Sequence, residues 1–178
     1  MLDVKTPLSK IHRASRHVDQ DTFAAVPGSW AYYDGSADEL KNIATDSTNQ
    51  DQPPVLKIIM GNASTNIYES HDIEVGSIST LEGILRASVD SEGFQVYMGG
   101  VSATTAVDYA QGDELTVAYL ITSATATTGA SFSKPEDIGK LRPVATNGET
   151  VVARVESYDS TAGVLTFETV SPYPTQSL

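Results

Sequence analysis

Two stretches near the end of the chain decide the fold: Gly148-Glu-Thr-Val-Val-Ala-Arg-Val-Glu-Ser157 and Gly163-Val-Leu-Thr-Phe-Glu168. Apolar residues recur at every second position in both, while Arg154, Glu156, Thr166 and Glu168 occupy positions between them. This period of two is typical of a strand with one buried face. The residues that join the stretches include aspartate, serine and glycine, which suit a turn or a bulged loop. We therefore predict a β-hairpin that buries one face.

Further short strand candidates precede this hairpin, each bounded by glycine, asparagine or aspartate. They lie at residues 28–35, 55–60, 84–89, 94–98 and 115–121, with two more within 67–75. Regularly spaced short strands separated by turn residues are typical of sandwiches and small barrels. The fold class that we predict is mainly β, with a compact β-sandwich or jelly-roll-like body or a small barrel. The chain shows no repeat of fixed period, which argues against a solenoid.

Composition supports a folded protein and excludes several kinds of chemistry. Of the 178 residues, 40% are hydrophobic and 19% are charged, which is enough apolar material for a core. Cysteine is absent, so disulfides, thiol catalysis and thiolate metal sites are excluded. No apolar run is long enough to span a bilayer or to form a signal peptide, so we expect a protein without a membrane partner, made in a cytoplasm.

The chain is expected to divide into an extended N-terminal arm, residues 1–27, and a β-rich body, residues 28–178. The arm has only a thin apolar stripe between two prolines, with room for one short helix. In the body, residues 36–54 are expected to form a long loop with one helical turn near 39–43. Loops of this length in compact domains are more often functional than idle, and we expect this one to contact a partner. Residues 124–133 are mostly threonine, alanine, serine and glycine, which predicts an exposed loop or an edge covered by a neighbouring chain.

Charge divides the chain in the same way. Residues 1–20 carry Lys5, Lys10, Arg13 and Arg16 against two aspartates, a net charge of +2, so the rest of the chain carries −14 of the total of −12. An acidic body argues against a nucleic-acid partner, because such binding needs a basic surface that displaces counterions. The basic residues of the arm, together with His17, are instead candidates for contact with an acidic protein surface.

The residues that could support catalysis do not form a known motif. Two of the three histidines, His12 and His17, are five residues apart, which does not place both on one helical face as a zinc motif requires. His71 precedes Asp72, but no G-x-S-x-G elbow accompanies them. Glycine-rich phosphate loops are also absent from the sequence. We expect no catalytic residues, no cofactor and no metal, and hence no enzyme.

Three pairs of adjacent carboxylates are the remaining candidates for acid–base or calcium chemistry: Asp38-Glu39, Asp113-Glu114 and Glu136-Asp137. Adjacent residues of a strand point to opposite faces, so adjacency is weak evidence for a shared site. We interpret each pair as a turn or a helix start, where negative charge is favoured. Residues 46–51 are rich in oxygen ligands but lack the glycine and final glutamate of an EF-hand loop.

An aromatic cluster, Trp30, Tyr32 and Tyr33, leaves two interpretations open. Trp30 and Tyr32 share one strand face, which either covers the core or anchors a self-association or partner interface. The core is the usual place for such a face, and the anchor interpretation rests on the frequency of tryptophan and tyrosine in binding hot spots.

The segments Gly139-Lys-Leu-Arg-Pro-Val-Ala145, 148–157 and 163–168 together resemble small decoration or cement proteins of tailed-phage capsids. Gly28-Ser-Trp30 with Asp34-Gly35 is also similar to phage structural proteins in general. This resemblance implies a virion protein on the outer capsid surface, bound to the major capsid protein, made in the cytoplasm of a bacterial host and acting without catalysis.

On this basis we expect a homo-dimer or homo-trimer whose basic arm and long loop reach across neighbouring capsid subunits. Several weak contacts on a fixed lattice add up to tight binding, because each bound contact raises the effective concentration of the next. Two alternatives remain open: another virion component, such as a tail-tube, baseplate or connector protein, and a carbohydrate-binding β module with Trp30 and Tyr32 as its sugar platform.

Overall fold

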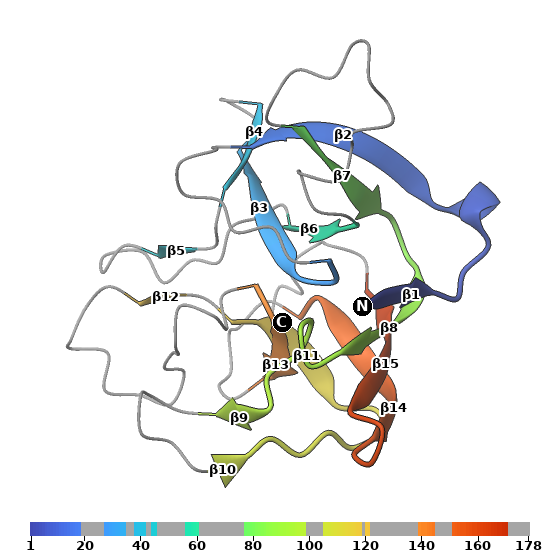
Figure 1. The fold of residues 1–178 in the computed structure, drawn as a ribbon, viewed down its shortest axis with the longest axis vertical. Helices are drawn as coiled ribbons and strands as arrows, with labels where there is room; N and C mark the ends of the chain where they lie inside the picture. Colours follow the sequence, from blue (N-terminus) through green and yellow to red (C-terminus); the bar gives the residue numbers. More distant parts are fainter. Residues whose placement is uncertain are drawn as a thin grey trace, which may run out of the picture.

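The computed structural model describes residues 1–18, 27–34, 38–41, 44–45, 56–60, 77–98, 105–118, 120–121, 139–144 and 151–170 (Figure 1). Within these ranges the chain forms β-strands and one short 3-10 helix, η1 (Leu8–Lys10), with no α-helix. The prediction of a mainly β protein is therefore confirmed. The strands form a six-stranded sheet, a small closed barrel and two short two-stranded pairings.

The six-stranded sheet is antiparallel throughout and is centred on the predicted hairpin. Its order is β1 (Leu2–Val4), β8 (Arg86–Asp90), β15 (Val164–Thr169), β14 (Ala153–Asp159), β11 (Glu114–Val117) and β13 (Leu141–Pro143). The apolar members of the alternating pattern, Ala153, Val155, Leu165 and Phe167, are buried, whereas Arg154 and Glu168 are exposed. The hairpin prediction is confirmed, with a register shift between Val155 and Ser157.

The barrel lies above this sheet in the view of Figure 1 and closes in the order β2 (His12–Val18), β4 (Glu39–Lys41), β3 (Trp30–Asp34), β6 (Leu56–Ile59) and β7 (Ser77–Glu82). All neighbours are antiparallel except β2 and β4. Two short pairings complete the described strands: β9 (Tyr97–Met98) with β10 (Thr105–Ala106), and β5 (Ala44–Thr45) with β12 (Leu120–Ile121).

The walls of the barrel contribute to two separate cores because successive residues of a strand face opposite sides. One side of the wall presents Trp30, Ile58 and Leu81, which join the apolar face of the six-stranded sheet in one large cluster. The other side lines the barrel interior with a smaller cluster, Ala31, Leu40, Ile59 and Ile78, against which Tyr33 packs. The barrel and the sheet therefore share a core.

A close backbone approach fixes one junction between the two parts. The amide of Trp30 on β3 donates to the carbonyl oxygen of Gly139 at 2.7 Å, and the amide of Gly139 donates to the carbonyl of Ala118 at 2.9 Å. Gly139 has a φ of 85°, and a Cβ added there would lie 2.5 Å from the Trp30 carbonyl oxygen. Only glycine satisfies both the backbone angle and the contact.

The expected N-terminal arm does not stand apart from the body over residues 2–18. β1 pairs with β8 in the sheet, β2 pairs with β7 along residues 12–17, and Ile11 between them is buried. The prediction of a separate arm is therefore not confirmed for residues 2–18, and residues 19–26 lie outside the described ranges. β2 was not recognised in the sequence because the face that lines the barrel carries His12 and Arg16, with only the small Ala14 between them.

The expected loop over residues 36–54 is also corrected where the structure describes it. Residues 39–41 form β4 and residues 44–45 form β5, so the helical turn predicted near 39–43 is wrong. Leu40 is fully buried in the barrel interior, which holds this short segment as a strand between β2 and β3. The predictions for residues 46–54, 67–75 and 124–133 concern chain outside the described ranges.

Thr169 ties the end of β15 to the turn that follows β7. Its side chain is buried, the amide of Leu85 donates to its Oγ1 at 2.8 Å, and Oγ1 donates to the carbonyl of Gly83 at 3.0 Å. Thr169→Val keeps the shape but leaves both backbone groups without this partner. We expect a loss of about 1–3 kcal/mol in the free energy of unfolding, measured by urea denaturation. Thr166→Val on the same strand is the control, since it removes only a contact with the Ser88 hydroxyl, and an equal loss in both variants would contradict the prediction.

Candidate binding surface on the barrel

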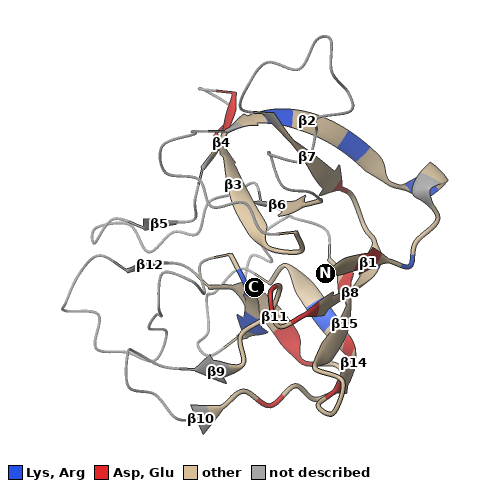
Figure 2. Ribbon diagram, in the orientation of Figure 1, with Lys and Arg blue, Asp and Glu red and all other residues tan. Residues whose placement is uncertain are grey.

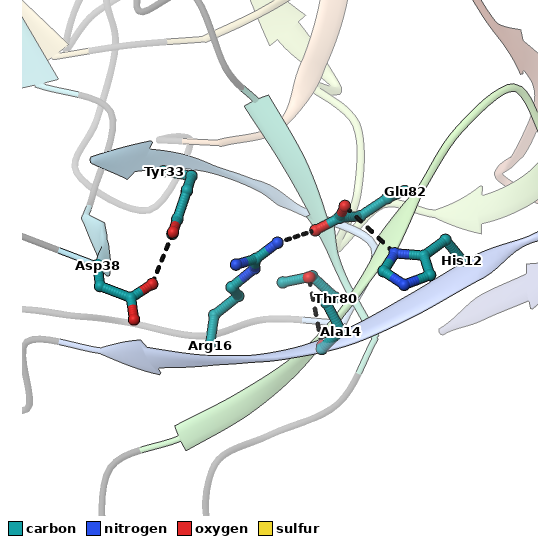
Figure 3. Close-up of polar contacts among 7 residues, drawn as sticks. All are labelled: His12, Ala14, Arg16, Tyr33, Asp38, Thr80 and Glu82. Carbon is teal, nitrogen blue, oxygen red and sulfur yellow. Dashed lines mark hydrogen bonds and ion pairs between the residues drawn. The ribbon is translucent and has the colours of Figure 1, made fainter. Parts of the chain in front are cut away.

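The polar side chains at the barrel interior come mainly from β2 and β7. Their register pairs His12 with Glu82, Ala14 with Thr80 and Arg16 with Ile78, so these six residues share the interior face of the wall. The small Ala14–Thr80 pair lies between Arg16 and Glu82. This arrangement leaves room for the Arg16 side chain to extend along the interior face, where its Nη2 donates to Glu82 Oε1 at 2.8 Å (Figure 3).

Glu82 bridges two basic side chains. Its second oxygen, Oε2, lies 3.4 Å from Nδ1 of His12, at the end of β2 opposite to Arg16. The Glu82 side chain is 16% exposed, whereas the His12 side chain is 72% exposed. The contact with Arg16 is therefore the more strongly desolvated of the two and contributes more to holding β2 against β7.

The Arg16 guanidinium also stacks on an aromatic ring. Its Cζ lies 4.4 Å from the centroid of Tyr33 on β3, and the Tyr33 hydroxyl donates to Asp38 Oδ1 at 2.6 Å (Figure 3). Asp38 occupies the turn before β4 with a φ of 56°, a conformation that aspartate tolerates better than most residues. The hydrogen bond to Glu82 raises the pKa of Arg16, and the hydrogen bond to Asp38 raises the pKa of Tyr33.

We call Arg16, Glu82, His12, Tyr33 and Asp38 the polar cluster. Each charged group in it meets an opposite charge or a hydrogen-bond donor, and Arg16 Nε is buried without a hydrogen-bond partner among the described residues. Arg16 is thus held by contacts from within the barrel. The arrangement joins three strands of the barrel wall.

Glu82→Gln should destabilise the barrel, because it removes the negative charge beside a guanidinium whose side chain is only 23% exposed. We expect a loss of about 1–3 kcal/mol in the free energy of unfolding. The matched control is Glu114→Gln, since the ion pair of Glu114 with Arg154 is solvent-exposed on both sides. That variant should lose at most about 0.5 kcal/mol in the same urea titration. Equal losses would show that the Arg16–Glu82 pair has no special structural role.

The five predicted capsid-contact residues do not form one equivalent set. Lys5 is exposed and paired with Asp3, while Lys10 and Arg13 are exposed and carry no ion pair among the described residues. His17 is exposed on β2. Arg16 is half-buried and paired with Glu82 in the polar cluster, so it is less available than the other four for contact with a partner. Figure 2 shows the blue basic segments that follow one another along η1 and β2.

The three aromatic residues also separate. Trp30 is buried in the large core and Tyr32 is partly buried against it, which confirms the interpretation that this face covers the core. Tyr33 packs inside the barrel. The anchor interpretation is wrong for Trp30, because its ring is needed where the barrel meets the sheet. Trp30 and Tyr32 therefore do not provide the exposed platform on which the carbohydrate-binding alternative depended.

Sequence reasoning missed Glu82 and Thr80 because it did not predict β7. In Ser77-Ile-Ser-Thr-Leu-Glu82 the apolar residues are three apart, since Ile78 faces the barrel interior and Leu81 faces the large core. A strand that serves two cores loses its period of two. Two of the carboxylate pairs do lie at turns, as interpreted: Asp38 binds Tyr33, and Asp113 accepts the amide of Ala110 at 2.8 Å. The third pair, at 136–137, lies outside the described residues.

In the part of the chain that the structure describes, no group of three or more histidine, aspartate or glutamate side chains is placed to hold a metal ion. Within the same ranges, no helix has the length and apolar character needed to cross a membrane. No protein-family model, no curated protein and no solved structure matches the chain significantly.

Proposed function

We propose that the chain is a structural virion protein that binds the outer surface of a tailed-phage capsid and cements the lattice of its major capsid protein. The observation that carries this proposal is the exposed basic segment at η1 and β2 of an otherwise acidic protein. Lys10 and Arg13 carry no ion pair among the described residues, although the chain has 23 carboxylates against 11 lysines and arginines. Cations left unpaired in such an excess of acid are suited to an acidic partner.

The resemblance to decoration proteins adds support. The residues that carry it include the β14–β15 hairpin and Gly139 with β13, which build the centre and one edge of the six-stranded sheet. The basic strand β2 belongs to the barrel, and the barrel shares a core with the six-stranded sheet. Such a support suits a protein that must hold capsid subunits together against outward pressure. In the proposal, a homo-dimer or homo-trimer presents several such strands to neighbouring capsid subunits, and multivalency makes the binding tight.

The basic strand replaces the flexible arm in the proposed mechanism. Because residues 12–18 are paired in the barrel, they are already ordered before binding and lose little conformational entropy when they meet the capsid. Lys5, Lys10, Arg13 and His17 remain the proposed contacts, and Arg16 is left out because it supports the barrel from within.

Co-sedimentation with purified capsids that lack the protein tests the proposal. We expect saturable binding with a fixed stoichiometry, an increase in the temperature at which the capsids release DNA, and weaker binding as salt rises. Absence of binding to these purified capsids would refute the cement function. Rings or tubes formed by the purified protein in electron micrographs would instead favour a tail-tube or connector component.

A further inference from the structure

The barrel strand β2 has one edge that is only partly covered by described strands. β7 pairs with β2 along residues 12–17, on one edge. On the other edge β4 pairs with β2 only at His17 and Val18. Residues 12–16 therefore meet no second strand among the residues that the structure describes. Alternate residues of this segment direct their backbone N–H and C=O groups away from β7, toward that edge.

We propose that this edge of β2 binds an extended, acidic peptide segment of a partner protein as an added β-strand. The open segment is about 17 Å long, which accommodates a strand of about five residues. Strand addition takes its affinity from backbone hydrogen bonds and its selectivity from the side chains beside them. The inference concerns the mode of binding and does not depend on the capsid assignment.

Charge selects the occupant. Lys10 lies in η1, just before β2, and Arg13 lies within the open segment; both are exposed and without an ion pair among the described residues. Arg13 shares the outward face of β2 with Ser15 and His17, which are also exposed. The inward face holds Arg16, which Glu82 neutralises. The net charge presented on the outside of this strand is therefore positive, and glutamate or aspartate in an added strand is favoured.

A second copy of the chain is a poorer occupant. Pairing of β2 with β2 would bring Lys10 and Arg13 close to the same cations of the other copy, and like charges across a strand pair are destabilising. Charged edge residues protect many proteins against such pairing. The outer strands of the six-stranded sheet, β1 and β13, are also less suited than β2 to pairing with an added strand. Each is three residues long, and β13 ends in Pro143, which lacks a backbone donor.

The test uses the full chain, labelled with 15N, and an eight-residue peptide of alternating threonine and glutamate with blocked ends. We expect saturable shifts of the amide resonances of residues 12–16. An analogue methylated on every backbone nitrogen has the same charge but no backbone donors, and we expect its binding to be at least about tenfold weaker. Equal binding of both peptides would show charge attraction alone and would overturn strand addition.

Two protein variants locate the contact. Arg13→Glu should weaken the unmethylated peptide by about tenfold, because one attraction is lost and one repulsion is gained. Arg154→Glu makes the same charge change at an exposed residue of β14, in the six-stranded sheet, and should alter the affinity less than about twofold. Equal effects of both variants, absence of peptide binding, or self-association that Arg13→Glu strengthens would each overturn the proposal. If the parent protein binds the peptide but does not bind capsids, only the cement function is refuted.

Discussion

Gly139→Ala is expected to lower the free energy of unfolding by about 3 kcal/mol or more. Two separate penalties combine at this position. An alanine at a φ of 85° adopts a left-handed backbone conformation that costs about 1 kcal/mol or more. Its Cβ would also lie 2.5 Å from the backbone carbonyl oxygen of Trp30, which a rotamer change cannot relieve. Separating the two backbones adds about 1–3 kcal/mol, as overpacking does in other cores.

Gly112→Ala is the matched control, because it isolates the backbone penalty. Gly112 has a φ of 92°, but nothing lies within 4 Å of a Cβ added there. We expect this variant to lose about 1 kcal/mol in urea or thermal unfolding, clearly less than Gly139→Ala. If both variants lose the same amount, the close approach between Gly139 and Trp30 does not contribute to stability as the structure indicates.

The part of the fold that the sequence predicted is the part where each strand serves one core. In the β14–β15 hairpin, one face packs on the large cluster and the other meets solvent, so hydrophobic residues alternate with polar ones. β3 and β6 are exceptions, because they serve both cores and were still predicted: each is apolar enough to stand out between turn residues. In these elements local sequence and tertiary environment agree.

The barrel strands that the sequence did not predict are those whose environment reverses the usual pattern. β2 directs Arg16 toward the interior, where Glu82, 66 residues away along the chain, supplies the compensating charge. No local pattern in residues 12–18 reveals that partner. β4 is three residues long and is held by the burial of Leu40, which is a tertiary effect. The spacing of residues along the sequence therefore could not predict that the members of the polar cluster lie together.

The candidate contact residues differ in their surroundings for the same physical reason. Net charge marked residues 1–20 as basic, but charge alone does not distinguish a cation that supports the fold from one that is available to a partner. Arg16 and Arg13 are three residues apart and lie on opposite faces of β2. Only the register with β7 assigns Arg16 to the interior and Arg13 to the surface.

Phe167→Ala is expected to lower the free energy of unfolding by about 3–5 kcal/mol, as removal of a fully buried aromatic ring does elsewhere. Phe167 lies in β15 at the middle of the six-stranded sheet and is 0% exposed within the large core. Phe167→Leu, which keeps most of the apolar volume, should lose less than about 1.5 kcal/mol. Glu168→Ala, at the exposed neighbouring position, should stay within about 0.5 kcal/mol of the parent protein.

The large core also predicts that this change in the sheet unfolds the barrel. Phe167 belongs to the same buried cluster as Trp30, Ile58 and Leu81 of the barrel wall, so neither part keeps an intact core when the other opens. Trp30 is the one tryptophan of the chain and lies in β3 with its side chain in the large core, which makes its fluorescence a reporter on the barrel wall that packs against the sheet. In Phe167→Ala, the urea midpoint of Trp30 fluorescence should shift together with that of the far-ultraviolet circular dichroism. A fluorescence midpoint that stays at the parent value while the dichroism midpoint falls would show that the barrel is stable without the sheet, and the shared core would then be energetically unimportant.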